Sequence, residues 1–218
     1  MEQSIFFSFF GGVSQDGTSW MIDFDKVLLE LAKWLLPIGV CLLAEGICLE
    51  EWRKIESLSC YRYEKVKIWW RKKFVKSLLN GLAVAAVLLI LAIAVDILGA
   101  VRSSGQSWKE VWKVLILWFV HLVTILSLFV VLDLTKLRRL APAILLLFEG
   151  FTFLVGFQSM GISRFMYGMW GMYFQSEWNF GETGVSVSIS LMTEGALLAI
   201  SYLIGRFILG RAILSEQR

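Results

Sequence analysis

The feature that most constrains this chain is an apolar stretch, residues 77–95, that runs for nineteen residues without a charge. A helix that crosses the hydrocarbon core of a bilayer, about 30 Å thick, needs roughly 20 predominantly apolar residues. The stretch therefore predicts a membrane-spanning helix, on which Gly81 and Ala85 favour close approach of a second helix. Because 57% of the chain is hydrophobic and only 18% is charged, we expect further spans and exclude an ordinary soluble domain.

Four other apolar stretches are long enough to span, and they predict an all-α fold, a polytopic transmembrane helical bundle of five spans. The spans are expected at about 27–49, 77–95, 114–132, 140–157 and 185–209. A sixth span would require residues 1–26 to cross, but the apolar part of that segment, 5–10, is too short. We therefore predict an N-terminal interfacial segment, 1–26, followed by a transmembrane domain, 27–218. The segment's expected interface anchors are Phe6, Phe7, Phe9 and Phe10.

A basic run between the first two spans sets their direction. Residues 50–76 carry nine of the chain's 21 lysines and arginines. Short loops with many positive charges are retained on the cytoplasmic side of a membrane. We therefore expect the N-terminus outside and the C-terminus in the cytoplasm. Because the positive charge is concentrated in this loop, we expect no nucleic-acid partner.

The second half of the basic run has helical periodicity. Tyr63, Val66, Trp70 and Phe74 recur at steps of three and four, with charged residues on the other sides. One interpretation is an interfacial helix with Trp69 and Trp70 at headgroup level and lysines facing anionic lipid. The other is a docking element for a soluble partner.

Residues 158–184, between the last two spans, form what we call the lid segment. It holds seven aromatic residues with interspersed glycines, which predicts an ordered segment against the outer membrane surface. Aromatic and methionine side chains give an adaptable apolar surface suited to an amphipathic ligand. We expect Trp170, Tyr173 and Trp178 to contribute to a substrate path, the alternative being a simple interfacial belt of aromatic side chains.

Two glutamates, Glu149 and Glu194, fall well inside predicted spans, away from the interfaces. A charged group at the centre of a spanning helix costs roughly 2.5–3.5 kcal/mol on insertion scales, and therefore needs a partner or water. We expect the two carboxylates either to line the substrate path and attract cationic groups, or to be protonated groups packed between helices. The single histidine, His121, is expected to be packed or pore-facing and not a metal ligand, because no second histidine accompanies it.

The sequence lacks the motifs of several kinds of nucleotide-binding, metal and protease site. There is no GxxxxGK[ST] loop to hold ATP phosphates and no HExxH zinc motif. The pair Glu50 and Glu51 is followed by Ile55 where an intramembrane protease motif of the EExxxR type requires arginine. We therefore expect a non-catalytic chain that binds no cofactor and no metal.

The order of features resembles the permease subunit of a bacterial ABC-2-type transporter, of the kind found in bacteriocin (lantibiotic) export and immunity systems. The matching residues of the basic run are Arg62, Tyr63, Trp69, Trp70 and Lys73. Those of the lid segment are Gly168, Trp170, Gly171, Met172, Tyr173 and Ser176. Members of the family usually have six spans and a cytoplasmic N-terminus, whereas five spans are counted here.

The resemblance implies a multi-pass protein of the bacterial cytoplasmic (inner) membrane that moves a peptide or amphiphile. ATP and Mg would be bound by a separate ABC ATPase subunit, and a second permease chain would complete the transporter as a homo- or heterodimer. The cytoplasmic amphipathic helix would be the coupling helix, and its ATPase-binding residues would be Arg62, Tyr63, Val66, Trp69, Trp70, Lys73 and Phe74. The alternative is a non-transporting accessory or immunity membrane protein that binds a toxin or stabilises a membrane complex.

Overall fold

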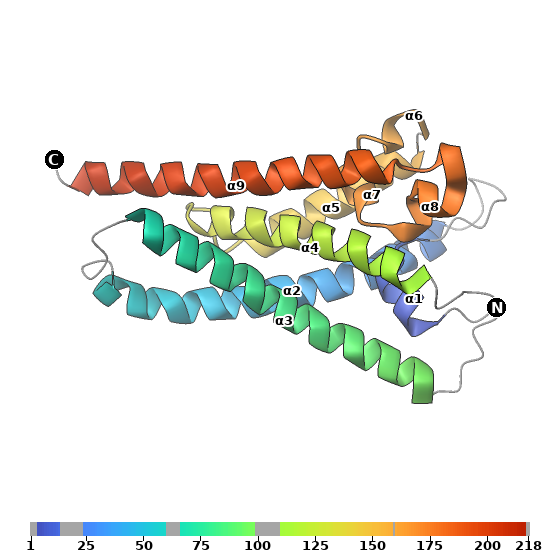
Figure 1. Ribbon diagram of the computed structural model, residues 1–218, viewed down its shortest axis with the longest axis horizontal. Helices are drawn as coiled ribbons and strands as arrows, with labels where there is room; N and C mark the ends of the chain where they lie inside the picture. The colour runs from blue at the N-terminus through green and yellow to red at the C-terminus, as the bar shows by residue number, and fades with distance from the viewer. Residues whose placement is uncertain (1–3, 14–23, 60–65, 99–109, 159, 217–218) are drawn as a thin grey trace.

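In the computed structural model the described residues are 4–13, 24–59, 66–98, 110–158 and 160–216. Five long helices run along the longest axis of the molecule (Figure 1). They are α2 (Phe24–Ser59), α3 (Val66–Leu98), α4 (Val111–Asp133), α5 (Ala141–Gln158) and α9 (Val187–Glu216). The short helices are α1 (Ile5–Phe10), α6 (Met160–Ser163), α7 (Tyr167–Trp170), η3 (Tyr173–Gln175), α8 (Glu177–Phe180) and η4 (Gly181–Thr183). The prediction of an all-helical bundle is confirmed for these residues.

Four of the helices are long and apolar enough to cross a membrane. Their candidate spans are Asp25–Glu51, Ile68–Leu98, Val111–Asp133 and Val187–Leu209. The remaining predicted span, 140–157, becomes α5, whose apolar part Ala141–Gly156 is shorter than these four. Hydropathy therefore supports a membrane-embedded bundle.

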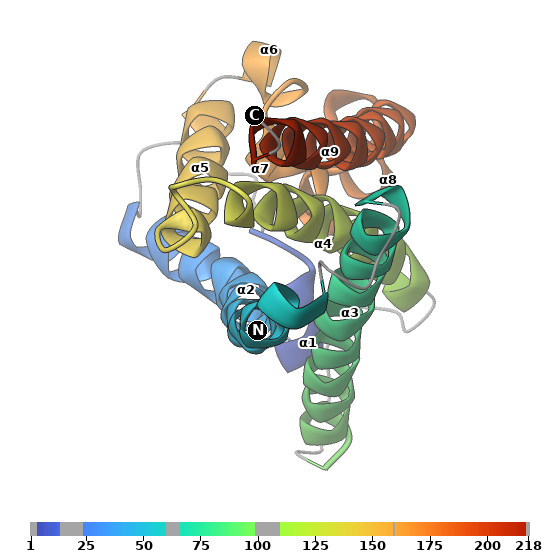
Figure 2. The same ribbon diagram turned by 90° about the vertical axis from the view of Figure 1, so that its left-hand side faces the viewer.

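Helix α4 occupies the middle of the bundle, with α9, α5, α2 and α3 arranged around it (Figure 2). This position explains why 67% of its apolar window is buried by protein, against 22–39% for the other three candidate spans. The two ends of the bundle differ in composition. One end, which we call the lid end, carries α1 and the short helices of the lid segment (Figure 1). The other, the basic end, carries the start of α3 and the turn 134–140 with Lys136, Arg138 and Arg139.

The basic run is more helical than the sequence suggested. Helix α2 continues to Ser59, and α3 begins at Val66 and runs without interruption into its apolar span. Only residues 60–65 separate the two helices, and they lie outside the described part of the chain. The amphipathic helix predicted in a loop is therefore the first part of a long spanning helix.

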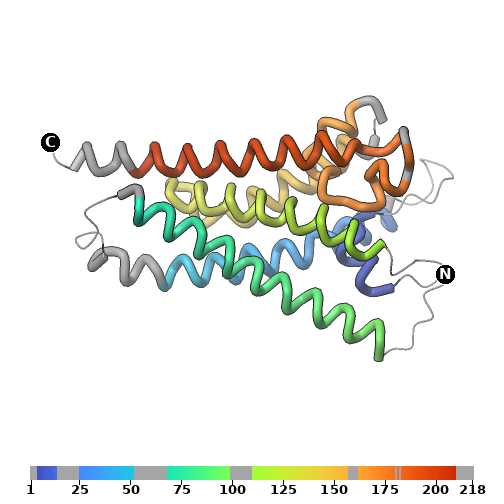
Figure 3. Tube along the Cα trace, viewed as in Figure 1, coloured from blue at the N-terminus to red at the C-terminus, as the bar shows by residue number. Residues whose placement is uncertain are grey.

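Helix α1 packs at the lid end against α2, α3 and α4 (Figure 3). Phe6, Phe7 and Phe10 are buried, and the Phe10 ring lies 4.8 Å from the ring of Trp118 on α4. This burial corrects the expectation that these phenylalanines anchor the segment at the membrane interface. A six-residue helix is too short to span, but its aromatic side chains fill the space between the diverging helix ends.

An aspartate from a distant helix end fixes the start of α1. Asp96 accepts hydrogen bonds from the backbone N–H groups of Ile5 and Phe6 at 2.8 and 2.9 Å, and from the Ser4 hydroxyl at 2.5 Å. The first N–H groups of a helix have no partner within it, and a carboxylate there also opposes the positive end of the helix dipole. Asp96 therefore supplies from α3 the cap that the short N-terminal sequence lacks.

Candidate functional site

The most unusual site in the described structure is a cluster of one histidine and two glutamates, which we call the buried cluster. His121 Nδ1 lies 2.5 Å from Glu194 Oε1, and His121 Nε2 lies 2.8 Å from Glu149 Oε1. All three residues are 0–1% exposed. They come from α4, α9 and α5, so the cluster joins three helices near the middle of α4.

Aromatic residues enclose the imidazole. The ring of Tyr167 on α7 lies 4.8 Å from the ring of His121, and the ring of Trp34 on α2 lies 6.2 Å from it. The Trp34 Nε1–H also donates a long hydrogen bond of 3.4 Å to Glu149 Oε1. Four helices and the lid segment therefore contribute to this one site.

Two glycines let the lid segment approach the cluster closely. A Cβ on Gly171 would lie 2.5 Å from the His121 ring, and a Cβ on Gly168 would lie 2.4 Å from the backbone oxygen of Glu149. Atoms do not approach that closely, so only glycine fits at these positions without movement. The backbone N–H of Gly168 also donates to the Thr152 hydroxyl on α5 at 3.0 Å. The lid segment therefore packs directly against the cluster.

The hydrogen-bonding pattern limits how protons can be distributed in the buried cluster. Each imidazole nitrogen faces a carboxylate oxygen, so if both glutamates are ionised both ring nitrogens must donate and His121 carries a positive charge. The cluster then has one net negative charge, which is costly to bury in an apolar bundle. A cationic group placed beside the carboxylates would offset that charge.

Several buried polar atoms around the cluster have no hydrogen-bond partner among the described residues. They are Oε2 of Glu149, Oε2 of Glu194, the Tyr167 hydroxyl and Trp118 Nε1. Unpaired buried polar groups are rare and often mark a functional site or a place for water. No group of three or more histidine, cysteine or acidic residues in the described chain is placed to hold a metal ion.

Glu194 also lines an apolar groove of about 440 Å³ on the side of the bundle. The groove lies between α3, α4 and α9, with Leu82, Phe119 and Leu198 among its walls. It brings the surface of the bundle close to one carboxylate of the cluster. Glu149 does not line this groove. Both glutamates therefore contact His121, but only Glu194 borders the groove.

The aromatic residues predicted for the substrate path contact the protein itself. Trp170 is half-buried against the ring of Tyr167, 5.6 Å away, and its Nε1–H donates to the Arg164 carbonyl. Trp178 lies 5.5 Å from Trp112 at the start of α4. Tyr173 is buried, and this burial, together with the nearby Glu110 carboxylate, raises the pKa of its phenol. The three side chains do not line one open surface in this structure.

The aromatic face of the amphipathic helix is covered by the chain's own helix α9. Trp70 is fully buried, its Nε1–H donates to the Tyr202 carbonyl at 2.9 Å, and the Phe74 ring lies 5.3 Å from the Tyr202 ring. A Cβ on Gly205 would lie 2.0 Å from the Trp70 indole, so α9 fits closely around this side chain. Trp69 is also buried. These residues are therefore not exposed for the partner contact that the sequence suggested.

The remaining residues predicted to bind the ATPase have different surroundings. Lys73 is buried, with its ammonium 3.6 Å from Asp133 on α4 and 5.1 Å from the centre of the Trp69 ring. Val66 is the first residue of α3. Arg62 and Tyr63 lie outside the described residues.

The sequence could have indicated one part of this site that was not predicted. His121 is the only histidine, and it falls in the predicted span 114–132. The two predicted spans that follow in the sequence each carry one glutamate. Ionisable groups inside a membrane tend to pair with one another, so this histidine was a natural partner for Glu149 and Glu194. Trp34 gave no comparable signal, because its role depends on how α2 is rotated.

Comparison of the chain with protein-family models, with curated proteins and with solved structures found no match in any of the three.

Proposed function

We propose that this chain is the membrane-spanning permease subunit of a transporter that moves a cationic peptide or other cationic amphiphile. The observation that carries the proposal is the buried cluster, in which two carboxylates share one imidazole in the middle of the bundle. Ionisable groups at membrane depth are expensive, and in membrane proteins they commonly mark substrate or proton pathways.

The geometry suggests how such a cluster would act. His121 bridges Glu149 and Glu194 in the structure. A cationic group of the substrate that reached Glu194 from the adjoining groove would add a second positive partner for that carboxylate. Since Tyr167 and Gly171 of the lid segment pack against His121, a change in the cluster would alter the packing of the lid segment.

The energy source in this proposal is a separate ABC ATPase that holds ATP and Mg, and a second permease chain completes the transporter. These partners, the bacteriocin export or immunity setting and the bacterial inner membrane are supported by the family resemblance. Five spans with the N-terminus outside are supported by the distribution of positive charge. Because α9 covers Trp70 and Phe74, we place the ATPase contact at the exposed turn of the basic end, around Arg138 and Arg139.

The test is to purify the tagged chain in mild detergent together with the products of the reading frames beside its gene. We expect an ATPase to co-purify, and its ATP hydrolysis to be stimulated by a cationic amphipathic peptide. Glu194→Gln should abolish the stimulation, whereas Glu51→Gln, at an exposed position on α2, should leave it intact. Purification without an ATPase, or full stimulation of the Glu194→Gln complex, would reject the proposal.

A non-transporting accessory or immunity protein is the second candidate, and one observation favours it. The lid segment is tied to the N-terminal segment by hydrogen bonds from Phe174 N–H to the Gly11 carbonyl at 2.9 Å and from Gln175 Nε2 to the Val13 carbonyl at 2.7 Å. A lid held in this way suits a protein that binds a toxin or stabilises a complex without opening. Protection of a sensitive cell by this chain alone, with no ATPase present, would select this function.

A further inference from the structure

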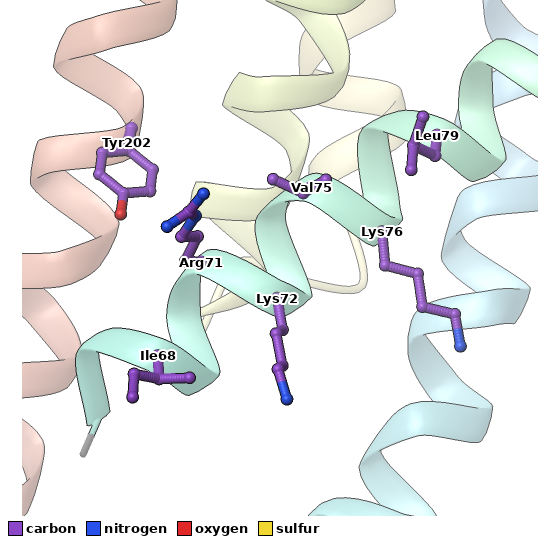
Figure 4. Close-up of a pocket in the computed structure, with 7 residues that line it drawn as sticks. All are labelled: Ile68, Arg71, Lys72, Val75, Lys76, Leu79 and Tyr202. Atoms are coloured by element: carbon purple, nitrogen blue, oxygen red, sulfur yellow. The ribbon is translucent and has the colours of Figure 1, made fainter.

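A second groove, of about 680 Å³, lies at the basic end between α3 and α9 (Figure 4). The side chains that line it are both apolar and cationic. They are Ile68, Arg71, Lys72, Val75, Lys76 and Leu79 from α3 and Tyr202 from α9. The groove includes no residue of the buried cluster, and the proposed transport function does not use it.

The α3 residues of the groove form one continuous stripe. Counted from Ile68 they stand at i, i+3, i+4, i+7, i+8 and i+11, which is the spacing of a single helix face. Ile68, Val75 and Leu79 are 48%, 46% and 59% exposed, and the three cationic residues are exposed as well. The stripe therefore presents apolar surface and positive charge together.

The packing of α3 fixes the direction in which this stripe faces. Trp70 and Phe74 hold the opposite side of the helix against α9, and Lys73 is paired with Asp133. Rotating the stripe inward would break these contacts. Its exposure is therefore built into the fold.

The depth of the groove favours a lipid over a soluble protein as its occupant. The lining residues of α3 lie at the start of the candidate span Ile68–Leu98, where the basic run 50–76 meets the uncharged stretch 77–95. At 1.5 Å per residue, the distance from Ile68 to Leu79 along α3 is about 16 Å, so the groove extends from the headgroup level toward the hydrocarbon core. A phospholipid, with a polar headgroup above an acyl chain, matches this position better than a soluble protein does.

The charge of the groove selects the type of lipid. In Figure 4 Arg71 points toward Tyr202, while Lys72 and Lys76 extend on the other side of the helix axis. A guanidinium forms paired hydrogen bonds to phosphate oxygens, and long lysine stems can reach the headgroup level from within the span. On the predicted topology this end faces the cytoplasmic leaflet, where anionic lipids attract basic residues.

We infer that this groove binds an anionic glycerophospholipid, with the phosphate between Arg71 and Tyr202 and an acyl chain along Val75 and Leu79. Val75 and Leu79 lie deeper along α3 than Arg71, in the order that a headgroup followed by an acyl chain requires. The lysines add attraction for a net negative headgroup.

The test uses the purified, delipidated full chain and native mass spectrometry. Phosphatidylglycerol and phosphatidylcholine with identical acyl chains are titrated separately. We expect tighter binding of phosphatidylglycerol, and an approximately thirtyfold weakening by Arg71→Gln with Lys72→Gln, since each basic residue near an anionic surface contributes on the order of a fivefold effect. The matched pair Arg138→Gln with Arg139→Gln, exposed at the same end but outside the groove, should change binding by less than about threefold.

Further variants and ligands make the result decisive. The charge-preserving pair Arg71→Lys with Lys72→Arg should retain the preference for phosphatidylglycerol. Equal binding of the two lipids to the wild-type chain would overturn the inference, as would equal losses in the two neutralised pairs. Glycerol phosphate competing as strongly as the whole lipid would also overturn it, because the acyl chain would then contribute nothing. If Arg71→Gln with Lys72→Gln abolished co-purification of the ATPase but left lipid binding unchanged, the groove would be assigned to a protein partner instead. The measurement uses the isolated chain, so its outcome does not depend on the proposed transport function.

Discussion

Replacing His121 with leucine should strongly destabilise the bundle. Leucine has a similar size, so the main change is loss of the imidazole that lies 2.5 Å from Glu194 and 2.8 Å from Glu149. Glu149 would keep only the 3.4 Å contact with Trp34, and the second carboxyl oxygens of both glutamates already lack partners among the described residues. Removing one partner of a buried charge pair typically costs about 3–5 kcal/mol, because the other charge stays buried without compensation.

The assay is thermal unfolding of the purified chain in detergent at neutral pH. For a chain of this size each kcal/mol shifts the melting temperature by roughly 2–4 °C, so His121→Leu should lower it by about 6–20 °C. Ser127→Ala is the matched control, since Ser127 is also buried on α4 but donates only to the Thr124 carbonyl. Losing that bond should cost about 1 kcal/mol.

A rescue variant separates charge from packing. In the His121→Leu background, Glu149→Gln with Glu194→Gln removes both carboxyl groups and should recover most of the lost stability. If His121→Leu cost no more than Ser127→Ala, the cluster would contribute nothing special to stability. If the triple variant stayed as unstable as His121→Leu, misfitting leucine and not unpaired charge would be the cause, and the reasoning would fail.

Four further predictions concern the ends of the bundle and the contacts between its helices. With the native cysteines replaced, an impermeant thiol reagent should label a cysteine at exposed Asn179 in intact cells but not one at Leu137, and the reverse result would invert the topology. Gly171→Ala should cost about 1–3 kcal/mol in thermal unfolding, because its methyl group would overlap the His121 ring. Asp96→Ala should accelerate amide hydrogen exchange across residues 5–10, and unchanged exchange would show that aromatic packing alone holds α1. Trp70→Ala should destabilise the isolated chain by about 3–5 kcal/mol, whereas a residue reserved for a partner would leave it unaffected.

The positions of the spanning helices could be predicted because the signal is local. An uncharged apolar run must be long enough to cross a bilayer, and this requirement can be read from composition alone. The predicted span 114–132 differs from α4 by only a few residues at its start and one at its end. The extension of α2 into the basic run was missed, and so was the continuity of the predicted amphipathic helix with its span in α3, because charged residues end an apolar stretch without ending a helix.

The direction of the aromatic face could not be predicted from the sequence. Val66, Trp70 and Phe74 at helical spacing mark a face that must be buried, and periodicity is the same whether another protein or the same chain covers it. Here α9 covers Trp70 and Phe74, with Gly205 providing the space for Trp70. The relevant glycine lies more than 130 residues away in the sequence, and no local pattern connects the two.

The buried cluster could be predicted only in part for a related reason. Glu149 and Glu194 were identified from their cost at membrane depth, but their common partner depends on how three helices are rotated about their axes. The covering by Tyr167 and Gly171 depends in addition on the path of the lid segment. The choice between a path-lining and a packed glutamate was therefore left open by the sequence. In the structure both glutamates are buried and contact His121, and Glu194 also lines the groove between α3, α4 and α9.

The lid segment, α1 and the buried cluster are connected closely enough that they should respond as one unit. The lid contacts His121 through Tyr167 and Gly171, and it is bonded to the N-terminal segment through Phe174. Helix α1 of that segment is in turn held at its start by Asp96 on α3. Lifting the lid would expose the aromatic core of the lid end and leave the cluster open to water at the same time. A ligand that opens it must therefore bind the open form more tightly by at least the free energy of these combined contacts, since a ligand shifts an equilibrium only by its difference in affinity for the two states. The cationic amphiphile that we propose as the substrate would meet this requirement in both respects, because its apolar part would replace the aromatic contacts and its charge would pair with the carboxylates.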